Sequence, residues 1–338
     1  MTRRATSRMN GATADRTARP FANRHPARRQ AGLTLVELMV AVVIGLIVAA
    51  AAVAALLVAR NGFTTVDSTA QLRENARFTS DLIQRLTVQA GFEDVAERGF
   101  SVVPPAEKPP AIQGYDNSIL EISDLPNGLA NGSRSSRCGS ITDTSCVNGS
   151  DVLMIRFWGT SRGNPNVADG SMINCAGVGE PEGTDRATSI FHVVRSASGE
   201  PTLACTYLDT AGVWQTVPLV PGVEAFQVLY GVDNVVPGNA PSGTTDSVPD
   251  RYLRASQLVV AGDSAATLAN WRRVRSLRIG LLFRETSSTA QDRAATAATY
   301  DVLGDGFSVS ADTLSQLAVP ADGRLRQAMV FNVHLRNP

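Results

Sequence analysis

The chain has 338 residues, of which 43% are hydrophobic, and it carries 31 basic and 31 acidic side chains. This length allows one large domain or two modest ones with a hydrophobic core. After residue 32 no basic cluster with interleaved aromatic residues occurs. The sequence therefore predicts no nucleic-acid partner.

Residues 1–32 form a basic leader. They contain eight arginines and one acidic residue, Asp15, so the rest of the chain carries a net negative charge. A basic flank in front of an apolar segment is typical of the cytoplasmic side of a membrane. We therefore expect the leader inside the cell and the residues after Arg60 outside it.

The apolar segment 38–59 has 22 residues without a charge. As a helix it would be about 33 Å long, which is enough to cross a bilayer. A secretory signal would have a shorter apolar core of about 7–15 residues. A plain membrane anchor would leave Glu37, at the edge of the segment, unexplained. A carboxylate costs about 2.5–3.5 kcal/mol at a bilayer centre and less near the interface. An obvious partner for Glu37 is the amine that a cut between Gly32 and Leu33 would create.

The residues around this position resemble the processing signature of type IV prepilins and type II secretion pseudopilins. The matching residues are Gly32, Leu33, Thr34, Leu35, Val36, Glu37, Leu38 and Met39. Leu33 stands where phenylalanine is usual. The resemblance implies that prepilin peptidase cuts after Gly32 and methylates the new Leu33 amine. It also implies that Glu37 of one subunit pairs with that amine on a neighbour during assembly.

A long helix is predicted from Leu33 to Ala90, because no proline occurs between Pro26 and Pro104. Beyond the apolar segment, apolar or small residues recur at steps of three and four along one face. These residues are Leu72, Ala76, Thr79, Ile83, Leu86 and Ala90. Gly91 follows as a candidate for a left-handed C-terminal cap. We therefore assign 33–92 to an N-terminal helix and 93–338 to a β-rich head.

Strand patterns dominate the head. The predicted strands are Ser118–Ile122, Asp151–Trp158, Ile190–Arg195, Pro201–Leu208, Val213–Pro218, Val223–Tyr230, Arg275–Arg284 and Leu325–Arg336. Asp151–Trp158 is apolar on both faces and is expected to be central. The last two alternate and are expected to pair antiparallel, with one solvated face. Val235–Asp250 is predicted to be a long loop, and Ala255–Leu268 is ambiguous.

The order of several segments resembles the PilW type of minor pilin. The segments are 149–159, 223–233, 250–256, 271–285 and 330–337. The resemblance implies an α+β fold, in which a long N-terminal helix packs on an antiparallel β-sheet head with irregular loops. Type II secretion J-type pseudopilins are similar in fold.

A minor pilin of this type is expected to prime assembly of a type IV pilus and to enter the filament, near its tip. The implied partners are other minor pilins, the major pilin, prepilin peptidase, the inner-membrane assembly platform and, before assembly, membrane lipid. The implied location is the inner membrane, as a single-pass protein with a periplasmic head, and then the pilus at the cell surface. A type II secretion pseudopilin is the alternative. Neither function requires a cofactor.

Four cysteines lie beyond the apolar segment, at Cys138, Cys146, Cys175 and Cys205. An even number in an exported domain indicates two disulfides, for which three pairings are possible. We favour Cys138–Cys146, which brackets a loop rich in small polar residues, and Cys175–Cys205, which joins a loop to a predicted strand. A zinc site is not expected, because no C-x-x-C spacing occurs.

Residues 159–163 match the G-x-S-x-G pattern of hydrolases and raise the hypothesis of a membrane-tethered periplasmic hydrolase built on Ser161. That motif needs a helix directly after the serine, whereas Asn164, Pro165 and Asn166 follow and favour a turn. We therefore expect a loop at this position and no catalytic residue in the chain.

Two acidic patches could offer oxygen ligands to calcium. They comprise Asp233, Asp246 and Asp250, and Asp301, Asp305 and Gly306. Neither has the spacing of a calcium-binding loop, so no metal site is predicted. Trp158, Trp214 and Trp271 are expected in the sheet core or at an interface.

Overall fold

The computed structural model describes residues 32–93, 109–120, 146–181, 187–286, 297–307 and 315–337. Almost all of the predicted leader lies outside these residues, as do Cys138 and most of the predicted loop around it. Contacts divide the chain into two units, Met1–Ala59 and Arg60–Pro338.

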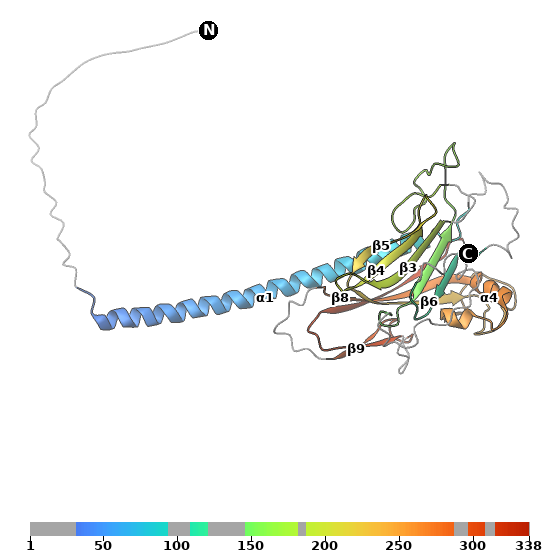
Figure 1. Ribbon diagram of the computed structural model, residues 1–338. Helices are drawn as coiled ribbons and strands as arrows, with labels where there is room; N and C mark the ends of the chain where they lie inside the picture. The colour runs from blue at the N-terminus through green and yellow to red at the C-terminus, as the bar shows by residue number, and fades with distance from the viewer. Residues whose placement is uncertain are drawn as a thin grey trace, which may run out of the picture. The chain divides into compact units, whose positions relative to one another are not determined.

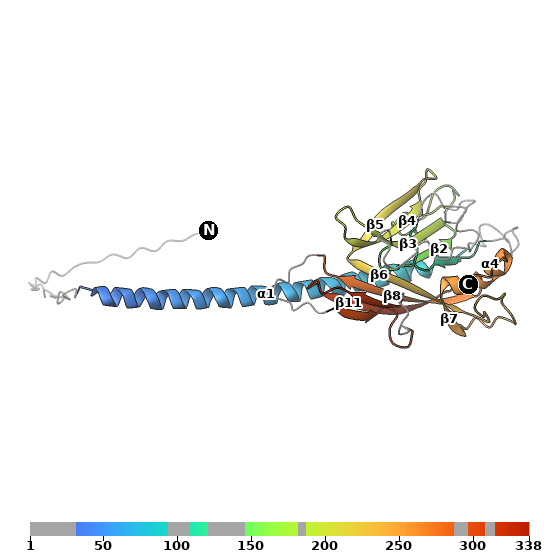
Figure 2. The ribbon, with the colours of Figure 1, turned by 60° about the horizontal axis from the view of Figure 1, so that its bottom comes forward.

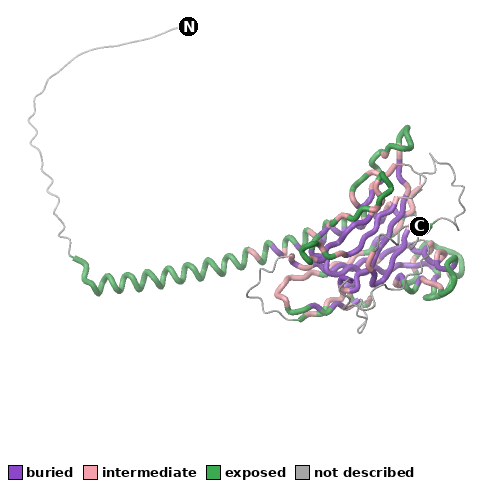
Figure 3. The backbone as a smooth tube through the Cα atoms, in the orientation of Figure 1, coloured by how far each residue is buried: buried purple, intermediate pink, exposed green. Residues whose placement is uncertain are grey.

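Helix α1 runs over Leu35–Thr87, which confirms the predicted long helix with ends two and three residues inside the expected ones. In the first unit the helix is exposed along its whole length, and its apolar run 38–59 contains only apolar residues and one glycine (Figure 3). By length and composition this helix could cross a membrane.

In the second unit, the predicted face of α1 is buried. Leu72, Ala76, Thr79, Ile83, Leu86 and Ala90 are each at most 6% exposed. The apolar members of this face belong to one continuous core that also contains residues from the five-stranded and the four-stranded β-sheets of the head. The spacing of apolar residues in the sequence therefore correctly predicted which face of α1 packs against the head.

Gly91 ends the helical segment and joins it to the sheet. Its φ of +71° is the left-handed value expected from the sequence. Its N–H donates to the carbonyl of Arg156 at 2.9 Å rather than to a carbonyl of the helix. A Cβ at this position would lie 2.0 Å from the carbonyl oxygen of Asn337, so only glycine fits without a shift of the backbone.

The first sheet has the order β1-β2-β3-β4-β5 and is antiparallel throughout (Figure 1). Its strands are β1 Ile112–Tyr115, β2 Val152–Phe157, β3 Ala187–Arg195, β4 Pro201–Leu208 and β5 Trp214–Pro221. Every residue of β2 is buried, which confirms its predicted interior position.

The strand predicted at Ser118–Ile122 is wrong, because described residues 118–120 form no strand and β1 lies earlier. Gly114 in the middle of β1 weakens the strand pattern in the sequence. A Cβ at this position would lie 1.8 Å from the Tyr230 hydroxyl, so the packing requires glycine. The same glycine makes the strand difficult to predict from the sequence.

The second sheet has the order β11-β8-β6-β7 (Figure 2). Its strands are β6 Val223–Val232, β7 Arg251–Leu253, β8 Val274–Arg284 and β11 Arg326–His334. The antiparallel pairing of β8 with β11 confirms the prediction, with Ile279 opposite Phe331.

The solvated face predicted for β8 is wrong. A hairpin of β9 Ala298–Asp301 and β10 Gln316–Val319 belongs to a small apolar cluster on that face, comprising Ala225, Leu282, Val302, Leu317 and Val319. The approach is close, since a Cβ on Gly280 would lie 2.0 Å from the carbonyl oxygen of Val302. Each strand of this hairpin has four residues, too few for alternation to predict.

The ambiguous segment Ala255–Leu268 forms a 3-10 helix, η2 Ala255–Leu258, and part of α4, Ser264–Trp271. The Asp263 carboxylate caps α4 by accepting the N–H of Ala266. Trp271 is buried edge-on against Tyr230, with ring centroids 4.8 Å apart. Trp158 and Trp214, which were also expected in the sheet core or at an interface, are partly buried.

Candidate processing and assembly site

Gly32, Leu33 and Thr34 precede α1 in an exposed stretch without regular secondary structure. Leu33 is 75% exposed, although it is a large apolar residue. A Cβ on Gly32 would meet no atom within 4 Å. The peptide bond between Gly32 and Leu33 is therefore open to a second protein.

Thr34 and Glu37 form a reciprocal pair at the first turn of α1. The Glu37 Oε2 atom accepts the Thr34 N–H at 3.0 Å and the Thr34 hydroxyl at 3.0 Å. The Glu37 N–H donates to the Thr34 hydroxyl oxygen at 3.2 Å. This arrangement is a capping box, which satisfies backbone donors that a helix start leaves unpaired.

The sequence predicts an assembly role for Glu37, and Thr34 was expected only as part of the processing signature. The spacing of a threonine three residues before a glutamate, ahead of an apolar run, is the pattern that would have indicated the cap. The cap also places the carboxylate at the positive end of the helix dipole, which favours a negative charge there.

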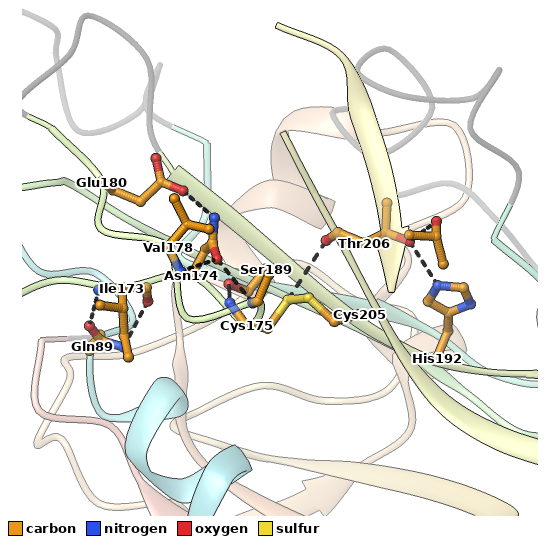
Figure 4. Close-up of a disulfide and its surroundings, with 12 residues drawn as sticks. Gln89, Ile173, Asn174, Cys175, Val178, Glu180, Ser189, His192, Cys205 and Thr206 are labelled. Carbon is orange, nitrogen blue, oxygen red and sulfur yellow. Dashed lines mark hydrogen bonds between the residues drawn. A yellow bond between two sulfur atoms is a disulfide. The ribbon is translucent and has the colours of Figure 1, made fainter. Parts of the chain in front are cut away.

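A disulfide joins Cys175, in an irregular loop, to Cys205 on β4, with Cα atoms 5.9 Å apart (Figure 4). It is one of the two pairs favoured from the sequence. Both cysteines are buried, and the Cys175 N–H donates to the Ser189 hydroxyl on β3 at 3.0 Å. Cys146 is also disulfide-bonded, and its expected partner, Cys138, lies outside the described residues.

The loop around this disulfide is built from short local hydrogen bonds. The Asn174 side-chain oxygen accepts the N–H groups of Ala176 and Val178 at 2.9 and 3.1 Å. Gln89, just beyond α1, exchanges two hydrogen bonds with the backbone of Ile173. The loop is therefore fixed to the helix end as well as to the sheet.

Ser161 lies in a turn and not at a nucleophile elbow. It forms an isolated bridge with Ala168, and its hydroxyl donates to the carbonyl of Pro165 at 3.1 Å. The backbone N–H of Val167 donates to the Asn164 carbonyl, which closes a turn where the hydrolase motif requires a helix. The geometry gives the hydrolase hypothesis no support.

The carboxylates of Asp233 and Asp250, in the first acidic patch, accept hydrogen bonds from backbone N–H groups of the same loop. Asp233 is fully buried, and its Oδ2 atom accepts the N–H groups of Asp246 and Ser247 at 3.1 and 3.0 Å. Asp250 accepts the N–H of Asn234 at 2.6 Å. Among the described residues, no group of three or more metal-ligating side chains could hold an ion.

Two family models match the chain. The model described as Type IV Pilus-assembly protein W matches residues 190–337, and the prokaryotic N-terminal methylation motif matches residues 27–53. Over these residues the chain resembles type IV pilins of the PilW type. The methylation motif covers the capped start of α1 and its apolar residues as far as Val53, and the PilW match runs from within β3 to beyond β11. Proteins of this family and fold are generally not enzymes.

Comparison with curated proteins gives no match. Among solved structures, the chain is similar to the type IV-like pilin TTHA1219 from Thermus thermophilus. The two share 13% identity with a TM-score of 0.37, over 79% of this chain and 98% of that one.

Proposed function

We propose that this chain is a minor pilin that primes assembly of a type IV pilus and is incorporated near the tip of the filament. The observation that carries the proposal is the match of both segments, the methylation motif at 27–53 and the PilW model at 190–337. Its partners would be other minor pilins, the major pilin and the inner-membrane assembly platform. The PilW match favours a pilus over the secretion pseudopilin.

Processing would begin with prepilin peptidase at the bond between Gly32 and Leu33. Hydrolysis would leave a carboxylate on Gly32 and a free amine on Leu33, and transfer of a methyl group to that amine would keep its positive charge at neutral pH. The exposure of Gly32 and Leu33 supports access to this bond.

Glu37 would then have two alternative partners. In the single chain its carboxylate accepts two hydrogen bonds from Thr34. In a filament it would pair with the methylated amine of a neighbouring subunit. Two charges that are buried separately in an apolar bundle are each costly, whereas a pair offsets much of that cost. The pairing would favour one axial register between adjacent helices.

Before assembly, the apolar run 38–59 would hold the chain in the inner membrane, with the leader in the cytoplasm and the head in the periplasm. The exposure of this run in the isolated chain supports contact with lipid first and with other pilin helices later. After assembly the head would lie on the pilus at the cell surface.

Intact-mass and N-terminal analysis of the chain recovered from membranes tests this proposal. The expected product begins at Leu33 and carries one added methyl group on its amine. A product that retains its arginine-rich leader, or that begins beyond residue 59, would contradict it. Recovery of the same product from sheared pili, and its absence when the other prepilins are deleted, would place it in the filament.

A further inference from the structure

Two aspartates stand opposite each other in the interior of the head. β1 and β2 pair antiparallel, with Tyr115 opposite Val152, so one further step of the same register places Asp116 opposite Asp151. Residues directly opposite each other on two strands point to the same face, with Cβ atoms about 4.5–5.5 Å apart. Asp116 is 5% exposed and Asp151 is 1% exposed. The head therefore contains two buried carboxyl groups at neighbouring positions.

Asp151 joins the first sheet to the second. Its Oδ1 atom accepts the Asn117 N–H at 2.9 Å, and its Oδ2 atom accepts the N–H of Val228, on β6, at 2.8 Å. Its backbone N–H donates to the carbonyl of Phe226, on the same strand, at 2.8 Å. The residue that precedes β2 is therefore held to β6 by its backbone and by its side chain.

Asp116 makes a second link, to the 3-10 helix η2. Its Oδ1 atom accepts the Ala255 N–H at 2.9 Å, and its Oδ2 atom accepts the Ser256 N–H at 2.8 Å. Each oxygen of both carboxyl groups thus accepts a backbone N–H. Such donors favour the ionised form of a carboxyl group. The hydrogen bonds alone would therefore leave both aspartates charged.

Burial without a counter-charge opposes this. Within the residues that the structure describes, neither aspartate forms an ion pair. The basic side chain that acts on Asp151 is Arg254, which is only partly buried and donates to the Gln227 Oε1 atom at 3.4 Å. Burial, and after it the charge of Asp116, raise the pKa of Asp151 well above 3.8, and they outweigh its N–H donors and Arg254.

Tyr230 fills the space beside the two aspartates. Its hydroxyl lies where Gly114 has no side chain, since a Cβ there would be 1.8 Å away, and Gly114 shares a face of β1 with Asp116. The hydroxyl is buried and has no hydrogen-bond partner among the described residues. Burial, followed by the charges of both aspartates and of Tyr115, raises the pKa of Tyr230. The phenol therefore stays neutral and does not balance the carboxyl groups.

We propose that Asp116 and Asp151 form a proton-dependent junction between the sheets, in which Asp151 keeps a proton at neutral pH and Asp116 carries the charge. Loss of that proton at higher pH would place two negative charges opposite each other, which destabilises a pair of strands. The segments that would separate are those that the two side chains hold: the end of β1, the start of β2, β6 and η2. The inference concerns the fold of the head and is independent of the proposed function.

The junction predicts that stability falls as the pH rises. The unfolded chain releases the proton of Asp151 near pH 3.8, whereas the folded head releases it only at a higher pH. Between these values the folded chain binds one more proton than the unfolded chain. The unfolding equilibrium constant should therefore rise by up to about tenfold for each pH unit in this window.

Asp151→Asn tests this slope, because asparagine cannot ionise. Unfolding of the full chain by denaturant is measured in detergent from about pH 5 to about pH 9. We expect the unfolding constant of the wild type, divided by that of the variant, to rise with pH by up to about tenfold per unit. His192 is present in both chains, so its own pH dependence cancels. Parallel profiles for the two chains would overturn the proposal.

Asp233→Asn is the matched control. Asp233 is also buried and also accepts two backbone N–H groups, but it lies 3.7 Å from the guanidinium of Arg275. This variant should unfold more easily at every pH and keep the slope of the wild type. The same change of slope in Asp233→Asn as in Asp151→Asn would show that lost hydrogen bonds, and not the proton, cause the effect, and would overturn the proposal.

Infrared spectroscopy detects the proton itself. A protonated carboxyl group has a C=O stretching band separate from the bands of carboxylates. We expect a band of this kind in the wild type at neutral pH that Asp151→Asn lacks. In Asp116→Asn, which also serves where Asp151→Asn does not fold, the band should disappear at a lower pH than in the wild type, because the neighbouring charge is gone. A wild-type spectrum without the band at neutral pH would overturn the proposal. Stabilisation by added calcium that both variants lose would also overturn it, because a cation would then occupy the place of the proton.

Discussion

His192 is a buried imidazole on β3, 4% exposed, whose Nε2 atom lies 2.9 Å from the Thr206 hydroxyl. Thr206 in turn lies 2.7 Å from the Thr216 hydroxyl, so a short polar chain crosses three strands of the first sheet. Burial lowers the pKa of His192 from 6.5 to about 4. The folded head therefore contains this side chain in its neutral form at physiological pH.

This burial predicts a pH-dependent stability. Between pH 6.5 and 4 the unfolded chain binds a proton at His192 and the folded chain does not, so stability falls as the pH falls through this window. The loss approaches about 3 kcal/mol below pH 4. We expect His192→Gln to flatten this part of the profile of unfolding free energy against pH, measured by denaturant in detergent. His334→Gln, at an exposed position, is the control; equal slopes for His192→Gln and wild type would contradict the prediction.

Residue types at a fixed spacing were the most informative part of the sequence. The motif from Gly32 to Met39 predicts a processing site, and the same residues contain the threonine–glutamate spacing of the Thr34–Glu37 cap that the structure shows. The role of Asp233 could not be predicted, because its backbone partners Asp246 and Ser247 are distant in sequence. Their contact with Asp233 depends on the path of a loop. A buried carboxylate and an exposed calcium ligand look alike in a sequence.

At the scale of elements, a helix or strand could be predicted where its apolar residues recur at a regular spacing. The packed face of α1 and the pairing of β8 with β11 followed from steps of three or four and of two. β1, β9 and β10 have four residues each, too few to show a period. The irregular loop around Cys175 has no period, and the asparagine turn that holds it became evident only in three dimensions.

The disulfide is expected to contribute strongly to the stability of this loop. Cys175 and Cys205 are 30 residues apart, and closing a loop of that length stabilises a protein by about 3–4 kcal/mol in the chain-entropy account. We expect Cys175→Ser and Cys205→Ser each to lower the unfolding free energy by about this amount, measured by denaturant under non-reducing conditions. The double variant should cost little more than either single variant, because one cross-link is lost in each case. Additive losses would show that the side chains act independently of their bond.

At the scale of the whole head, an ion-pair network joins the two sheets. Glu200, in the turn between β3 and β4, pairs with Arg284 at 2.8 Å and with Arg324 at 2.9 Å. Glu224 on β6 pairs with Arg326 at 2.6 Å and with Arg284 at 3.4 Å. The two carboxylates therefore share Arg284 between sheets. No spacing in the sequence predicts this network, because its members come from distant segments that meet only after folding.

In the filament, Glu37 is expected to contribute to assembly. Glu37→Gln keeps a side chain that can complete the cap and removes the charge, whereas Thr34→Ala weakens the cap and keeps the charge. We expect Glu37→Gln and Glu37→Ala to be cleaved normally and to enter sheared pili at least about tenfold less than wild type, as for loss of a charge-assisted bond. Thr34→Ala should be incorporated nearly as well as wild type. Normal incorporation of Glu37→Gln would show that capping, and not charge pairing, is the role of this residue.

The contact between the end of the helical segment and residue 337 has a consequence for biosynthesis. The side-chain amide of Asn337 donates to the carbonyl of Ala90 at 3.4 Å, across 247 positions of sequence, and Gly91 packs against the same residue. A ribosome makes Leu72–Ala90 long before it makes β11. The apolar face of the helix therefore stays without the strands that finally pack on it while most of the head is still being translated. Nascent chains stalled before residue 326 should consequently be the species that chaperones and proteases encounter.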